Sequence, residues 1–120
     1  MNSFLKRRIF EPSLIILFLI VGFIPYFDAI DKIAPQYLYL SIVNSIAAIY
    51  ILFTSKKVVL KYASYVIASL FGLVIWSFIS LTHATNKAEV LIETSRVIIF
   101  LFSFVNLYVL INRNQSLLKY

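Results

Sequence analysis

The chain has 120 residues, of which 62% are hydrophobic and only 13% are charged. Soluble domains carry about 25% charged residues, so this composition excludes an ordinary water-facing surface. Because the chain contains no cysteine, it also excludes disulfides, thiolate metal sites and cysteine nucleophiles. The net charge of +6 gathers at the ends of apolar stretches, and this placement indicates a membrane protein rather than a nucleic-acid-binding one.

The first apolar stretch follows a basic start. The basic residues are Lys6, Arg7 and Arg8. The stretch that follows, residues 12–27, contains no Asp, Glu, Lys, Arg or His. Proline's fixed φ suits the first residue of a helix, so we predict a first membrane span at about residues 12–27. A cleaved signal peptide has the same basic-then-apolar order, but no small-residue cleavage site follows here.

Three further apolar stretches follow along the chain. About 20 apolar residues cross the hydrocarbon core of a bilayer at about 1.5 Å per residue. The sequence therefore predicts further spans at about residues 35–54, 60–82 and 88–111. The expected fold class is all-α: a polytopic membrane protein with four transmembrane helices, all within a single membrane domain covering residues 1–120.

Lysines and arginines divide unequally between the two sides of these spans. Three lie at the N-terminus, three in the loop after the second span and two in the tail, which makes eight on one side against two on the other. The positive-inside rule then places both termini in the cytoplasm and the loops 28–34 and 83–87 outside. We expect a multi-pass protein of the bacterial inner membrane with this orientation.

Arg96 is the candidate substrate-binding residue, because it lies near the outward end of the fourth span. Glu93 is three residues earlier on the same helix face, and Glu89 lies one further turn outward. In one interpretation, Arg96 anchors the helix at the interface as the ion-pair partner of Glu93. In the other, its planar guanidinium binds an anionic headgroup or a lipid-linked pyrophosphate.

Other polar and small residues within the spans indicate packing. Asn44 lies at the middle of the second span, where we expect it to hydrogen-bond across a helix contact. Ala68 and Gly72 form a small-xxx-small pattern, which predicts close helix packing in the third span. His83, the only histidine, lies at the outward end of that span, and its expected role is interfacial because no carboxylate stands at ligand spacing.

The sequence contains none of the patterns from which a catalytic centre is assembled. Its only glycines, Gly22 and Gly72, both lie within spans, and paired carboxylates and a Ser-His-Asp set are missing. We therefore predict no catalytic residue, no metal site and no cofactor in this chain.

Two segments of the chain carry a family resemblance. Residues 27–44 read FDAIDKIAPQYLYLSIVN, and residues 80–89 read SLTHATNKAE and lead on to Arg96. These segments resemble the first two outward loops, and the second helix, of O-antigen ligase and polymerase-like membrane proteins of the Bacteroidetes type. The resemblance implies a metal-independent transfer of a glycan from undecaprenyl pyrophosphate to an acceptor at the outer face of the inner membrane.

The resemblance also implies which partners the chain has. Members of that family are larger, and their main catalytic loop lies well downstream, so we expect an N-terminal fragment that cannot catalyse alone. Its expected partners are the lipid bilayer, the remaining transmembrane helices of the parent protein and an undecaprenyl-pyrophosphate-linked glycan contacted by Arg96, with no nucleic acid.

Two alternatives from other functional classes remain open. One is a complete four-helix protein such as a GtrA-like flippase or transporter subunit, and the other is a non-catalytic assembly subunit. A small multidrug exporter requires a buried acid in its first span, and residues 13–27 contain none.

Overall fold

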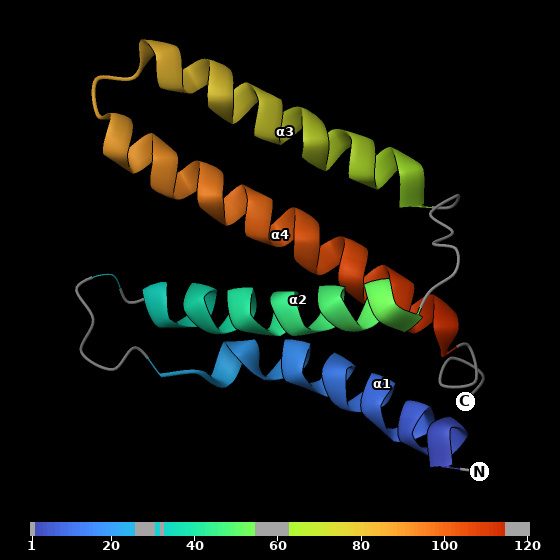
Figure 1. Cartoon of the computed structure of the whole chain (residues 1–120). Helices are drawn as coiled ribbons and strands as arrows, with labels where there is room; N and C mark the ends of the chain where they lie inside the picture. The colour runs from blue at the N-terminus through green and yellow to red at the C-terminus, as the bar shows by residue number, and fades with distance from the viewer. Residues whose placement is uncertain (1, 26–30, 32, 55–62, 115–120) are drawn as a thin grey trace.

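The computed structural model describes residues 2–25, 31, 33–54 and 63–114. These residues form four α-helices and one short 3-10 helix, and no strand occurs among them. The elements are α1 (Asn2–Ile20), η1 (Val21–Phe23), α2 (Ala34–Thr54), α3 (Ser64–His83) and α4 (Lys87–Arg113). Figure 1 shows α4 in the middle, with α3 on one side and α2 and α1 on the other.

The all-α prediction is confirmed for the described residues. Helices α2, α3 and α4 are long and apolar enough to cross a membrane, whereas the apolar part of the first helical stretch, Ile9–Phe23, is shorter. Composition and helix length together thus describe a helical membrane protein. The fourth crossing and the orientation of the chain stay predictions.

The start of the first helix differs from the prediction. Helix α1 begins at Asn2, and Pro12 lies inside it rather than at its first position. An interior proline removes one backbone hydrogen bond, which transmembrane helices tolerate where neighbouring groups bond the exposed carbonyls. The carbonyl that loses its helical N–H partner is that of residue 8, and the Ser13 hydroxyl donates to the next carbonyl, that of Ile9, at 2.9 Å.

The end of that helix follows the local proline rule. The backbone passes into η1 and becomes extended at Ile24, with φ −70° and ψ 121°. A residue that precedes proline disfavours the α conformation, and Pro25 follows Ile24 directly. The predicted last residues of this span, 26 and 27, lie outside the described residues, as do residues 60–62 of the third predicted span.

The apolar core joins α1, α2 and α4. Its buried side chains recur at helical spacing on the facing sides of these three helices, as expected for an apolar stripe. They are Leu14 and Phe18 from α1, Leu40, Val43, Ala47 and Ile51 from α2, and Val109 and Leu110 from α4. The hydroxyl of Tyr39 on α2 also donates to the carbonyl of Leu17 near the end of α1, at 3.0 Å.

Helix α3 lies along α4 and buries only one side chain, Val74. The packing prediction for Ala68 and Gly72 is wrong within the described part of the chain. Both residues are exposed, and a Cβ added at Gly72 would meet nothing within 4 Å. A small-residue pattern shows that a helix can be approached closely, but it does not show which face of α3 turns toward α4.

Candidate functional site

The candidate site lies where α2 and α4 begin, at one end of the bundle. Asn86 caps α4: its side-chain oxygen accepts from the backbone N–H of Glu89 at 3.3 Å, and its Nδ2 donates to Glu89 Oε2 at 3.3 Å. This reciprocal arrangement stabilises the first turn of a helix. It also holds the Glu89 carboxylate at the cap rather than at Arg96.

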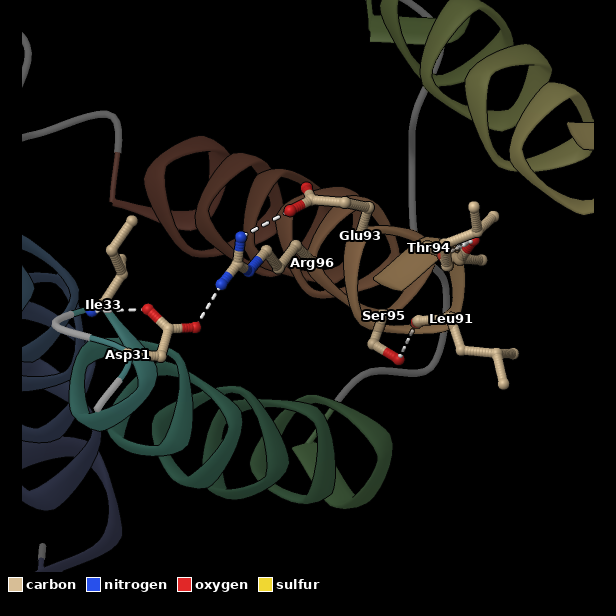
Figure 2. Close-up of polar contacts among 8 residues, drawn as sticks. Asp31, Ile33, Leu91, Glu93, Thr94, Ser95 and Arg96 are labelled. Atoms are coloured by element: carbon tan, nitrogen blue, oxygen red, sulfur yellow. Dashed lines mark hydrogen bonds and ion pairs between the residues drawn. The ribbon is translucent and has the colours of Figure 1, made fainter. Parts of the chain in front are cut away.

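Arg96 lies in the third turn of α4 and contacts two carboxylates (Figure 2). Its Nη1 donates to Glu93 Oε1 at 2.5 Å, which confirms the predicted pair on one helix face. Its Nη2 donates to Oδ2 of Asp31, which precedes α2. This second carboxylate was not predicted from the sequence, because it lies 65 residues away along the chain.

Asp31 is held by the start of α2. Its Oδ1 accepts from the backbone N–H of Ile33 at 3.0 Å, and its carbonyl accepts from the N–H of Ala34 at 3.1 Å. These bonds are the local contacts by which aspartate favours turns and helix starts. An aspartate shortly before an apolar run is a recognised helix-start signal, so Asp31 could have been placed here, though not its partner.

An aromatic ring forms the third contact of the guanidinium. The Cζ of Arg96 lies 5.2 Å from the ring centroid of Tyr37 on α2, which is cation–π distance. That ring packs edge-on against Phe100 of α4, with centroids 5.7 Å apart. We refer to Asp31, Tyr37, Glu93 and Arg96 as the Arg96 cluster.

Charge determines what the Arg96 cluster can bind. It contains two carboxylates and one guanidinium, so its formal charge is negative. The Arg96 side chain is 20% exposed, while those of Asp31 and Glu93 are 44% and 59% exposed. Both terminal nitrogens of Arg96 already donate to carboxylates, so an anion that binds these two nitrogens end-on competes with Asp31 and Glu93 for their N–H groups.

A second polar cluster lies midway along α2 and α4. Asn44 Nδ2 donates to Ser103 Oγ at 2.8 Å, and Asn106 Nδ2 donates to Asn44 Oδ1 at 3.0 Å. All three side chains are buried. The predicted interhelical hydrogen bonding of Asn44 is therefore confirmed.

A partly open pocket of about 270 Å³ borders this second cluster. The hydroxyls of Ser41 and Ser45, which line it, donate to carbonyls of their own helix at 2.8 and 2.9 Å. The wall is thus mainly apolar apart from Asn44. Its lining residues are Ser41, Asn44, Ser45, Ala48, Ile99 and Phe102.

The opposite end of the bundle contains a buried acid that the sequence analysis missed. Glu11 on α1 is 3% exposed. Its Oε1 accepts from the Tyr50 hydroxyl at 3.1 Å, its Oε2 accepts from Asn114 Nδ2 at 2.8 Å, and Arg113 Nη1 lies 3.5 Å from Oε1. The early start of α1 places Glu11 inside a helix, whereas the predicted span began one residue later.

His83 is the last residue of α3 and is exposed, at the helix end where the sequence predicted it. Among the residues that the structure describes, no group of three or more His, Asp or Glu side chains is able to hold a metal ion. The chemistry of the described site is therefore that of ion pairs, hydrogen bonds and aromatic contacts.

Comparison with protein-family models, with curated proteins and with solved structures finds no match to this chain.

Proposed function

We propose that this chain is the N-terminal transmembrane part of an O-antigen ligase or polymerase-like protein of the bacterial inner membrane. Such a protein transfers a glycan from undecaprenyl pyrophosphate at the outer face of that membrane. One observation supports the proposal: the two segments that carry the family resemblance lead into one cluster. Asp31 and Tyr37 belong to residues 27–44, and Arg96 follows residues 80–89 on α4.

In this proposal Arg96 contacts the pyrophosphate, and catalysis belongs to the remaining helices of the parent protein. The planar guanidinium of arginine matches two phosphate oxygens at once, which the compact ammonium of lysine cannot do. Tyr37 supports the guanidinium from one side, so its orientation is set before a ligand arrives. The phosphate then replaces a carboxylate at Arg96.

Substitution of Arg96 in the full-length parent tests this role. We expect Arg96→Lys to weaken glycan transfer and Arg96→Ala to abolish most of it, measured as glycan attached to the acceptor at equal protein abundance in the membrane. If Arg96 only anchors the helix, lysine should behave like the wild type, because either cation reaches the interface. Full transfer by Arg96→Ala would remove the residue from the functional site.

Glu93→Gln is the matched control for that experiment. It neutralises a carboxylate that pairs with the Arg96 guanidinium and leaves Arg96 itself unchanged. An exposed ion pair is worth about 0–1 kcal/mol, so transfer should stay close to the wild-type level. The separate chain of residues 1–120 should show no transfer, because no acid, base and nucleophile set is assignable in it.

A flippase or transporter subunit is the second candidate, and the buried carboxylate of Glu11 is the observation that favours it. Ionisable groups inside membrane proteins are commonly part of an ion or substrate pathway. Reconstitution of residues 1–120 in vesicles tests this candidate directly. Movement of a fluorescent phosphate-bearing lipid between leaflets, lost in Glu11→Gln, would support the transporter and argue against the ligase part.

A further inference from the structure

The guanidinium that the proposed function assigns to the pyrophosphate is already bound to an internal anion. Asp31 presents one carboxylate oxygen to Arg96 and keeps the other on the N–H of Ile33, at 3.0 Å. We propose that Asp31 is an internal competitor of the phosphate: the N–H of Arg96 Nη2 that donates to Asp31 binds either this carboxylate or a phosphate oxygen. This inference rests on the proposed function and adds a residue that sets the affinity for the lipid-linked group.

Asp31 is better placed for this role than Glu93. The aspartate side chain is short and is fixed by its own bond to the start of α2, so it stays near Arg96 and returns when a ligand leaves. Glu93 lies on the same helix as Arg96, has a longer side chain and is 59% exposed, so it turns toward water at little cost. The two acids thus differ in how strongly they oppose an incoming anion.

The rest of the Arg96 cluster keeps the guanidinium in position when Asp31 is displaced. The Tyr37 ring lies 5.2 Å from Cζ and is itself packed against Phe100, with ring centroids 5.7 Å apart. Asp31 in turn retains its bond to Ile33, so the exchange leaves the start of α2 capped. The exchange therefore replaces one charge-assisted hydrogen bond at Arg96 by another, at similar geometry.

The expected size of the effect follows from the exposure of the pair. An ion pair with partly exposed partners contributes no more than a modest stabilisation, so its removal should tighten phosphate binding about fivefold. Asp31→Asn is the suitable change. Its side-chain oxygen still accepts from Ile33, while the group that faces Arg96 loses both its negative charge and its acceptor oxygen.

The test uses the full-length parent in phosphatidylcholine nanodiscs, titrated with inorganic pyrophosphate in one arm and with undecaprenyl pyrophosphate in the other. The side-chain Nε–H resonance of Arg96 reports binding at the residue itself. We expect Asp31→Asn to bind about fivefold more tightly than the wild type and Glu93→Gln to change affinity by less. If Asp31→Asn raises the affinity only for undecaprenyl pyrophosphate, the site recognises the lipid. If it raises the affinity equally for both ligands, the site recognises the phosphate group alone.

Each remaining outcome contradicts a different statement. If Arg96→Lys weakens phosphate binding but Asp31→Asn does not tighten it, Asp31 is not a competitor of the phosphate, and the proposed function stands. Equal gains in Asp31→Asn and Glu93→Gln would show an effect of net charge and overturn the role of Asp31. If Arg96→Lys binds as the wild type does, or if no variant binds, both the contact and the competitor are overturned.

Discussion

Replacing Asn44 with alanine should destabilise the contact between α2 and α4 by about 1 kcal/mol. Asn44 makes two short interhelical side-chain hydrogen bonds, with Ser103 at 2.8 Å and with Asn106 at 3.0 Å, and its Nδ2 also donates to the carbonyl of Ile99 at the longer distance of 3.4 Å. Such bonds average about 0.6 kcal/mol each in membrane proteins, with a maximum of about 1.7 kcal/mol. Two of them therefore account for the expected loss.

The partners of Asn44 keep other bonds, which limits this loss. The Ser103 hydroxyl still donates to the carbonyl of Ile99 at 2.8 Å, and Asn106 Nδ2 still donates to the backbone carbonyl of residue 44 at 3.2 Å. Neither group becomes a buried polar atom with no hydrogen bond, so the larger penalty for such an atom does not apply. A loss well above 2 kcal/mol would contradict this account of the cluster.

The free energy of unfolding in detergent, measured by steric trapping, is the appropriate assay. Ser45→Ala is the matched control, because Ser45 neighbours Asn44, is exposed and donates its hydroxyl to the carbonyl of Ser41 within α2 at 2.9 Å. Combining Asn44→Ala with Ser103→Ala should show a coupling of about 0.6 kcal/mol. If Asn44→Ala costs no more than Ser45→Ala, the reasoning about this cluster is refuted.

Three further predictions concern topology and the ends of the helices. A single cysteine at Thr85 should react with a membrane-impermeant thiol reagent in intact spheroplasts while one at Ser55 should not, and the reverse pattern would overturn the predicted orientation. Glu11→Ala should cost at least about 2 kcal/mol of unfolding free energy, because it removes charge-assisted bonds from Tyr50 and Asn114, and Glu11→Gln should cost less; equal costs would show that the charge is irrelevant. Gly72→Ala should not destabilise the chain, since the added Cβ meets nothing within 4 Å and alanine favours the helix, and a measured loss would show a contact at that face.

The sequence alone determined the all-helical, apolar class of the protein and the approximate positions of α2, α3 and α4. Hydrophobicity over about 20 residues is a local property, so the predicted spans at residues 35–54 and 88–111 agree closely with α2 (Ala34–Thr54) and α4 (Lys87–Arg113). The pair of Glu93 and Arg96 was likewise readable, because residues three apart on a helix share a face. Pro12 misled the prediction, because a proline that suits a helix start also occurs inside transmembrane helices.

Only the tertiary structure decided which faces and which charges meet. Asp31 and Arg96 are 65 residues apart, and Glu11 and Asn114 are 103 residues apart, so no local spacing rule connects either pair. Ala68 and Gly72 had the pattern of a packing face but are exposed, whereas Asn44 forms the predicted contact. The physical reason is that periodicity defines the faces of one helix, while the rotation of each helix against its neighbours follows from the packing and hydrogen bonds of the whole bundle.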